Sequence, residues 1–412
     1  MGDDQRRFVE AATVDGREPR ARTLLAERPE LAAAGLDCAL VLGDAAAVAD
    51  ALRGDPGLVV RQVGARGWVP LLYPCHSCFA ADHRDGVRET VRLLLDAGAD
   101  PNATAPSPDW PGSIWTPLYG AAGRVHDPEL TRILLAAGAI PDDGESLYHA
   151  TETPDHACLR LLLEAGATVE GSNALPHMLD REDPDGARLL LEAGGDATGL
   201  LPFAVSRGRS SEIVRLLVEH GADLRERGAD GRTAYAGAVL NGRDDLVAVL
   251  EELGAEPDAG PAERLAGAFA RLDVEAARAL MREPPELDTR IRSAIVDYAV
   301  AHGLTGVAAL VEVGLGLELR GWEDRRPLHA AAWRGDVLTV DALIERGADI
   351  EARARTGLST PLGWAIHGSL HGPPGDHLAV ARRLVAAGAR VDPGEAEQGS
   401  DALADYLRSV AV

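Results

Sequence analysis

Pairs of short amphipathic helices are the pattern that recurs along this chain, and it is clearest between Arg326 and Arg353. The first helix of this stretch begins at Pro327, because proline is favoured in the first helical turn, and it ends at Gly335. The second ends at Gly347, and each glycine stands where a left-handed cap is usual. Both helices have one apolar face, formed by Leu328, Ala331 and Ala332 in the first and by Val337, Val340, Leu343 and Ile344 in the second.

The glycine that closes the second helix returns along almost the whole chain. Its spacing is 40, 28, 28, 27, 33, 60, 33 and 41 residues, and the step of 60 holds two units, the first of which ends at Pro285-Glu286-Leu287. Two more units end in the same Pro-x-Leu pattern, at Pro29 and at Pro56. Since one helix pair cannot bury its own apolar face, the copies must stack on one another. The nine glycines are Gly98, Gly138, Gly166, Gly194, Gly221, Gly254, Gly314, Gly347 and Gly388, which with the three other units gives 12 repeats.

The stretch Arg326-Pro327-Leu328-His329-Ala330-Ala331 resembles the ankyrin repeat, whose T-P-L-H-x-A signature recurs with a period near 33 residues. Thr116-Pro117-Leu118 and Thr360-Pro361-Leu362 keep the same signature, and residues 360–369 resemble a version common in bacterial ankyrin proteins. The resemblance implies an all-α fold, an ankyrin-repeat solenoid of about 12 helix-turn-helix repeats with short β-hairpin tips.

Two halves of the array have similar features, which suggests an old partial duplication. We expect an N-terminal array over 1–256 and a C-terminal array over 257–412, continuous with it and closed by a helix over 401–412 that covers the last repeat. Long spacings predict inserted loops at 80–89, 104–114 and 368–377.

Composition narrows the possible partners. The formal net charge is −24, from 41 basic and 65 acidic residues, so phosphate-rich nucleic acids and anionic membrane surfaces would be repelled.

There is no lysine, which excludes Schiff-base chemistry and a P-loop. Four cysteines are too few for a disulfide framework, and the first residues lack the apolar core of a signal peptide. We therefore expect a monomeric cytoplasmic protein, in composition typical of a high-GC bacterium.

The first helices should present binding residues, because the ankyrin resemblance implies that they line a concave groove. Positions two and five after the signature leucine fall on one helical face. These positions and their neighbours predict a partner-binding or ligand-binding surface, since exposed aromatic residues gather at binding sites. The alternative for each residue is that it fills a gap between helices. The set is Tyr73, His76, Trp110, Trp115, Tyr119, Phe203, Arg207, Trp333, Trp364 and His367.

Two histidine–carboxylate pairs, His149 with Glu152 and His177 with Asp180, offer a chemical alternative. Adjacent first helices lie roughly 8–10 Å apart, so the four side chains can converge. Together they would be candidates for acid–base catalysis or a divalent metal. The other interpretation is structural, with each histidine hydrogen-bonded to the tip of the next repeat.

The function that follows is a scaffold or adaptor that holds a basic protein or peptide in its groove. A small-molecule binder or an enzyme that uses the four residues above is the alternative, and the masking of a basic toxin is a third, supported by charge alone. We expect no cofactor and no resident metal. Cys75-His76-Ser77-Cys78 lacks the second cysteine pair and the preceding strand that zinc or redox motifs require.

Overall fold

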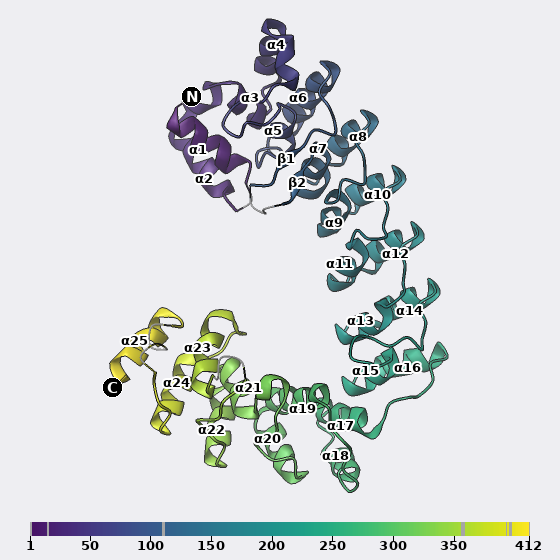
Figure 1. Cartoon of the computed structure of the whole chain (residues 1–412), viewed down its shortest axis with the longest axis vertical. Helices are drawn as coiled ribbons and strands as arrows, with labels where there is room; N and C mark the ends of the chain where they lie inside the picture. Colours follow the sequence, from purple (N-terminus) through teal and green to yellow (C-terminus); the bar gives the residue numbers. More distant parts are fainter. Residues whose placement is uncertain are drawn as a thin grey trace. The chain divides into compact units, whose positions relative to one another are not determined.

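The computed structural model describes residues 2–14, 16–108, 112–355, 359–392, 394 and 398–411. It divides into two compact units, Met1–Asp196 and Ala197–Val412, which Figure 1 shows in sequence colours. Both units consist of helices joined by turns, so the prediction of an all-α, ankyrin-like solenoid is confirmed.

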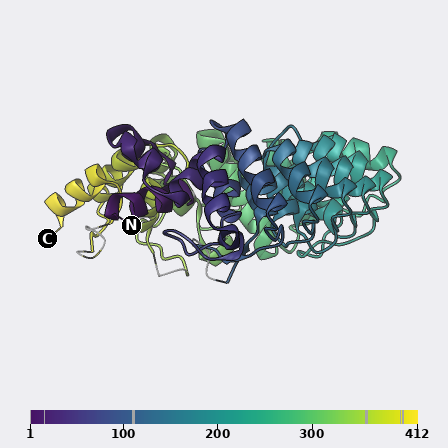
Figure 2. The same ribbon diagram turned by 90° about the horizontal axis from the view of Figure 1, so that it is seen from above.

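The first unit contains short helices that follow one another side by side (Figures 1 and 2). Its α-helices are α1 (Asp3–Ala12), α2 (Glu18–Glu27), α3 (Leu36–Leu42), α4 (Ala45–Gly54), α5 (Leu72–Cys75), α6 (Arg84–Asp96), α7 (Pro117–Tyr119), α8 (Pro128–Ala136), α9 (Ser146–His149), α10 (Ala157–Glu164), α11 (Ala174–Asp180) and α12 (Pro184–Glu192). Single turns of 3-10 helix, η1 (Pro29–Ala33) and η2 (Pro56–Val60), begin at two of the Pro-x-Leu sites, η4 (Ala150–Glu152) continues α9, and η3 (Gly120–Arg124) is a π-helical turn.

The second unit has longer and more regular helix pairs. They are α13 (Leu200–Ser206), α14 (Ser211–Glu219), α15 (Ala234–Leu240), α16 (Asp244–Glu252), α17 (Pro261–Ala270), α18 (Val274–Leu280), α19 (Thr289–Ala301), α20 (Gly303–Glu312), α21 (Pro327–Trp333), α22 (Val337–Glu345), α23 (Pro361–His371) and α24 (His377–Ala386), followed by α25 (Asp401–Val410). The short η5 (Trp322–Asp324) precedes α21.

Local sequence explains where these helices start and stop. The threonine of the signature caps α7, α15 and α23, with the side chain of Thr116, Thr233 or Thr360 accepting a hydrogen bond from a backbone N–H of the first turn, as N-cap residues do. All nine periodic glycines have φ between 85° and 107°. Because side chains strongly disfavour this left-handed region, glycine fixes the end of each second helix.

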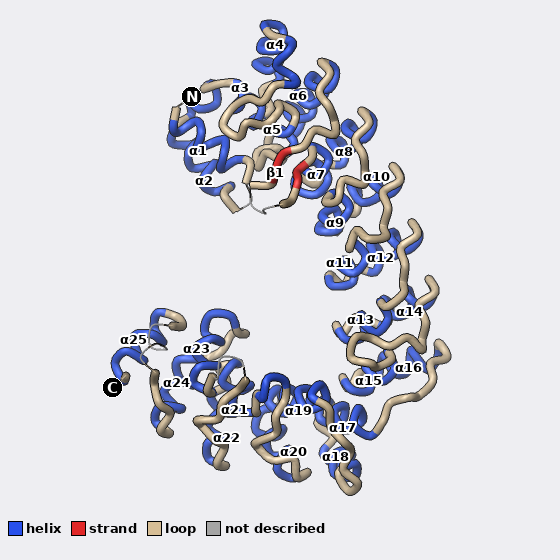
Figure 3. Tube along the Cα trace, in the orientation of Figure 1, coloured by secondary structure: helices blue, strands red, loops and turns tan. Residues whose placement is uncertain are grey.

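In the second unit, alternate helices form two layers. The first helices α13, α15, α17, α19, α21 and α23 pack in sequence, and each also packs against its own second helix. Figure 3 shows this alternation along the tube. Small residues permit the close approach: at Gly267 an added Cβ would lie 2.1 Å from the Val239 carbonyl oxygen. We call the side of the first-helix layer that faces away from the second helices the first-helix face.

The inserted loops differ in part from the prediction. Only residues 76–83 separate α5 from α6, because 84–89 belong to α6. Proline has no N–H and clashes with the carbonyl four residues before it. Pro74 therefore prevents α5 from extending toward the N-terminus, and the helix has a single turn. At 104–114, β1 (Ala105–Pro106) and β2 (Ile114–Trp115) form an antiparallel hairpin, the only sheet among the described residues. At 368–377, α23 runs on to His371, so the loop is 372–376.

The closing helix is present as α25, with Leu403 and Leu407 fully buried against the last repeat. The possible duplication junction near 256–261 lies inside the second compact unit. The division into arrays at 256, like the count of 12 repeats, stays a prediction.

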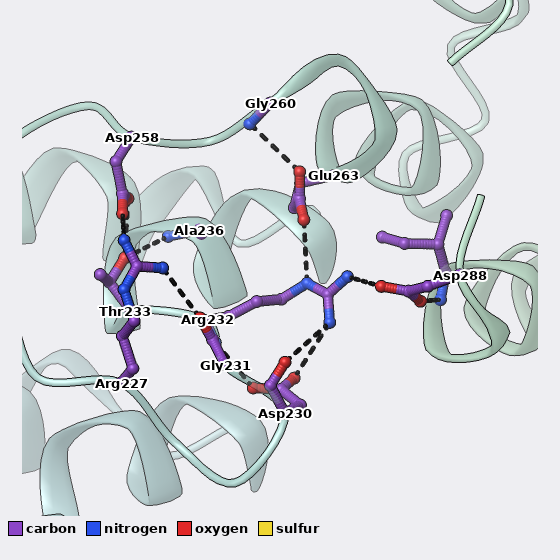
Figure 4. Close-up of polar contacts among 11 residues, drawn as sticks. Arg227, Asp230, Gly231, Arg232, Thr233, Ala236, Asp258, Gly260, Glu263 and Asp288 are labelled. Carbon is purple, nitrogen blue, oxygen red and sulfur yellow. Dashed lines mark hydrogen bonds and ion pairs between the residues drawn. The ribbon is translucent and has the colours of Figure 1, made fainter. Parts of the chain in front are cut away.

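An arginine-centred network joins the repeats that lack a clear signature. Arg232 donates to Glu263 on α17 at 2.9 Å and to Asp288, the cap of α19, and its guanidinium lies 3.6 Å from Asp230 (Figure 4). Glu263 also accepts the Gly260 N–H. The Arg232 side chain is only 10% exposed, so these pairs are screened less than surface ones. They tie three successive repeats together.

Candidate functional site

A continuous series of ring contacts runs through the first unit. We call it the aromatic ladder. His76 stacks on Trp115 with centroids 4.7 Å apart, Tyr119 lies 5.0 Å from His149, and Tyr148 stacks on His177 at 4.4 Å. Its members are Trp68, Tyr73, His76, Trp115, Tyr119, Tyr148, His149 and His177.

Most of the ladder is core rather than surface. Tyr73, His76, Trp115 and Tyr119 are all buried, with exposed fractions of 0 to 7%. The prediction that these four side chains face a partner is therefore wrong for this structure. For His76 and Trp115 the physical reason is the inserted segment, because the β1–β2 hairpin brings Trp115 onto His76. Tyr73 is instead held within its own repeat, against Trp68 and the Val63 carbonyl.

The buried polar groups of the ladder are satisfied internally. Tyr73 donates its hydroxyl to the Val63 carbonyl at 2.6 Å. His76 Nε2 donates to the Thr116 carbonyl at 2.8 Å, and its Nδ1 accepts from Arg124 at 3.0 Å. Burial, with Arg124 adding to it, holds the pKa of His76 well below its usual value. The Arg124 guanidinium also lies 4.3 Å from the centre of the Trp115 ring. The contacts among Arg124, His76 and Trp115 therefore have a structural role.

The four candidate catalytic residues lie on α9, η4 and α11. His149 does contact Glu152, at 3.1 Å through Nδ1, and its Nε2 lies 3.4 Å from Glu145. His177 shares a 2.8 Å hydrogen bond with Thr151. Burial lowers the pKa of His177, although Glu152 acts in the opposite direction. His149 thus lies against two carboxylates, and acid–base chemistry at the four residues stays a prediction.

Metal and thiol chemistry find no support in the geometry. Across the described part of the chain, no three His, Cys, Asp or Glu side chains are grouped closely enough to hold a metal ion, so the proposed two-histidine, two-carboxylate metal set is not assembled. Cys75 and Cys78 are free thiols. Burial raises the pKa of Cys75, and raises that of Cys78 to about 12, which disfavours the reactive thiolate.

Phe203 and Arg207 lie on α13 in the second unit. The Arg207 guanidinium stands 5.3 Å from the ring of Phe203 on its own helix. Phe203 is half-buried and borders a cavity of about 410 Å³ with Ser206, Asp230 and Arg290. Both residues are accessible, in agreement with the sequence, although the cavity has a single aromatic ring.

A second cavity lies where α21, α23 and η5 meet, and we call it the tryptophan pocket. Its volume is about 430 Å³, within the range of ligand sites. Three of the six tryptophans of the chain line it. The lining residues are Trp322, Glu323, Trp333, Ser359, Gly363, Trp364, Ile366, His367, Leu370, Gln398 and Gly399.

The rings of the tryptophan pocket are held but not covered. Trp333 meets Trp364 edge-on at 5.8 Å and lies 5.2 Å from the exposed His367. Trp333 and Trp364 are half-buried, whereas Trp322 is 54% and Leu370 56% exposed. The packing of α21 against α23 therefore holds the indoles of Trp333 and Trp364 in place, and the rest of their surface is accessible to solvent.

Two polar atoms at this pocket have no hydrogen-bond partner. Glu323 Oε2 and Trp364 Nε1 are both buried and unpaired, and such groups typically cost about 1–3 kcal/mol each. Glu323 also has a left-handed backbone, with φ of 53°, which a non-glycine residue seldom adopts. Strain and unpaired groups together are frequent at functional sites.

The sequence anticipated part of this pocket. Trp333, Trp364 and His367 were predicted as binding residues, and the structure places them together. Trp322, Glu323 and Leu370 were missed. Their signal was weak: Trp322 precedes Pro327, the first residue of α21, by a few residues, and nothing in the sequence shows that this turn folds toward α23. Trp110 lies outside the described residues.

Comparison with known proteins supports the assignment of the fold. The ankyrin repeat family model matches residues 323–355, the stretch from η5 through α21 and α22. With the stacked helix pairs described above, this supports an ankyrin repeat protein. No curated protein matches the chain. Among the described residues, no helix has both the length and the apolar character needed to cross a membrane.

Proposed function

We propose that this protein is a binding scaffold whose first-helix face holds another protein, with the tryptophan pocket as the main contact. Ankyrin repeats generally bind proteins, and the observation that supports this location is the gathering of Trp322, Trp333 and Trp364 at one open cavity. Tryptophan is the residue type most enriched among energetically dominant interface contacts. Aromatic residues make up 4% of the chain, so three indoles at one cavity are a marked concentration.

The partner that fits best is a basic protein or peptide. The net charge of −24 attracts cations from a distance and speeds their association. Leu370, beside the indoles, adds exposed apolar surface that water covers poorly. We therefore propose attraction by charge and retention by the tryptophan pocket.

The test compares the wild-type chain with Trp333→Ala in binding a partner purified from the native cell extract. Loss of an anchoring indole should weaken binding by about 2 kcal/mol or more, roughly 30-fold. Leu338→Ala is the matched control, because Leu338 is 70% exposed on α22, in the other helix layer. Equal affinity of wild type and Trp333→Ala, with both folded, would remove the tryptophan pocket from the binding surface.

A further inference from the structure

We propose that the tryptophan pocket receives a cationic side chain of the partner protein, arginine or lysine, with Glu323 as its counter-ion. The inference rests on the proposed function, because it names the chemistry that the binding surface recognises. Three features of the pocket carry it: the open indole faces, an unpaired carboxylate oxygen, and an unpaired indole N–H.

The indoles supply the first feature. The face of an aromatic ring attracts cations, and tryptophan does so best among the aromatic residues. The chain already shows this geometry at the same ring, since the guanidinium of Arg325 lies 5.3 Å from the centroid of Trp364. Arg325 is itself paired with Asp297 at 3.4 Å, so its charge is compensated within the chain. The indole surfaces of Trp322 and Trp333 are the ones left for a ligand.

Glu323 supplies the second feature. Its neighbour Asp324 pairs with Arg355, whose Nε lies 3.6 Å away. Glu323, in contrast, lines the pocket, and its Oε2 is buried without a hydrogen-bond partner, so the carboxylate pairs with a ligand by turning outward. A buried carboxylate oxygen is stabilised most by a positively charged donor.

Trp364 Nε1 supplies the third feature and favours a peptide over a free cation. An indole N–H only donates, so arginine and lysine side chains cannot satisfy it. A backbone carbonyl can. A peptide that carries a cationic side chain offers both groups at once, a donor for Glu323 and an acceptor for Trp364.

The experiment measures binding of two probe peptides to the full chain by calorimetry. One is acetyl-Gly-Gly-Arg-Gly-Gly-amide, and the other replaces arginine with citrulline, a neutral side chain of nearly the same shape. We expect the arginine peptide to bind about tenfold more tightly, the range of a desolvated cation–aromatic contact with a counter-ion. Glu323→Gln should bring the ratio close to one. Asp324→Asn is the matched control and should keep most of it.

The outcomes separate this inference from the proposed function. Equal binding of the two peptides, or no binding of either, overturns the cationic site. If partner binding still depends on Trp333 in that case, the scaffold function stands without it. A preference for arginine that survives Glu323→Gln but disappears in Asp324→Asn would also overturn the inference, because it would assign the counter-ion to the wrong carboxylate.

Discussion

The imidazole of His76 lies flat against the indole of Trp115, with ring centroids 4.7 Å apart and planes 12° from parallel. His76 follows the one-turn helix α5, and Trp115 belongs to the hairpin inserted before α7. This stack joins two successive repeats through side chains that the repeat pattern alone would place in an open groove. In the second unit, Trp364 and His367 stand where Tyr73 and His76 stand in the first, two and five residues after the signature leucine, but Trp364 is half-buried and His367 exposed. The difference explains why binding is assigned to the second unit.

Replacement of Trp115 by alanine should destabilise the first unit by about 3–5 kcal/mol, because a large buried side chain leaves a cavity. Urea unfolding followed by circular dichroism measures the change. Ile114→Ala is the neighbouring control, since Ile114 is 55% exposed, and it should stay within about 0.5 kcal/mol of wild type. Equal effects of the two substitutions would contradict the assignment of Trp115 to the core.

Stability should fall as the pH drops from 6.5 toward 4. His329 is fully buried; its Nε2 donates to the Ala352 carbonyl and its Nδ1 accepts the Arg326 N–H. Burial lowers the pKa of His329 from 6.5 to about 4. The unfolded chain therefore binds the proton first, and the folding stability present above pH 6.5 is lost progressively down to the folded-state pKa, by about 3 kcal/mol.

The measurement is the free energy of unfolding at a series of pH values in wild type and in His329→Gln. The variant is less stable at neutral pH but should lose less stability between pH 6.5 and 4. The lowered pKa of buried His76 adds to the slope in the same direction. A slope unchanged in His329→Gln would show that this histidine does not titrate on unfolding.

The Arg232 network makes a further prediction about the second unit. Arg232→Met leaves Glu263 and Asp288 without their shared cation and should cost about 2 kcal/mol, less than a fully buried pair because Asp288 is 53% exposed. Arg225→Met removes a comparable arginine whose pair with Glu256 is exposed on both sides, and it should cost at most about 1 kcal/mol. Hydrogen exchange should show faster opening of α17 and α19 only in Arg232→Met. Similar opening in both variants would rule out a joining role.

The sequence predicted the fold better than the site. Local rules predict the helix pairs, the left-handed glycines and the closing helix. The spacing of apolar residues, the capping residue and the terminal glycine each act within a few residues of the chain. The burial of His76 does not follow from such rules, since it depends on a hairpin inserted some 40 residues later. His177 shares a hydrogen bond with Thr151 from the preceding repeat, a contact that helical spacing alone could not predict. Glu323 joins the tryptophan pocket only through an uncommon backbone conformation.

The central claim is that the first-helix face at the tryptophan pocket contacts another protein. Site-specific photo-crosslinking tests it most directly, with the photoreactive residue p-benzoylphenylalanine at Leu370, which is exposed at the pocket rim. The same probe at Leu338, exposed on α22, serves as the control. The account predicts a crosslinked protein adduct in native extract from position 370, reduced by Trp333→Ala and weak or absent from position 338. Adducts of equal yield from both positions, or an adduct from 338 alone, would contradict it.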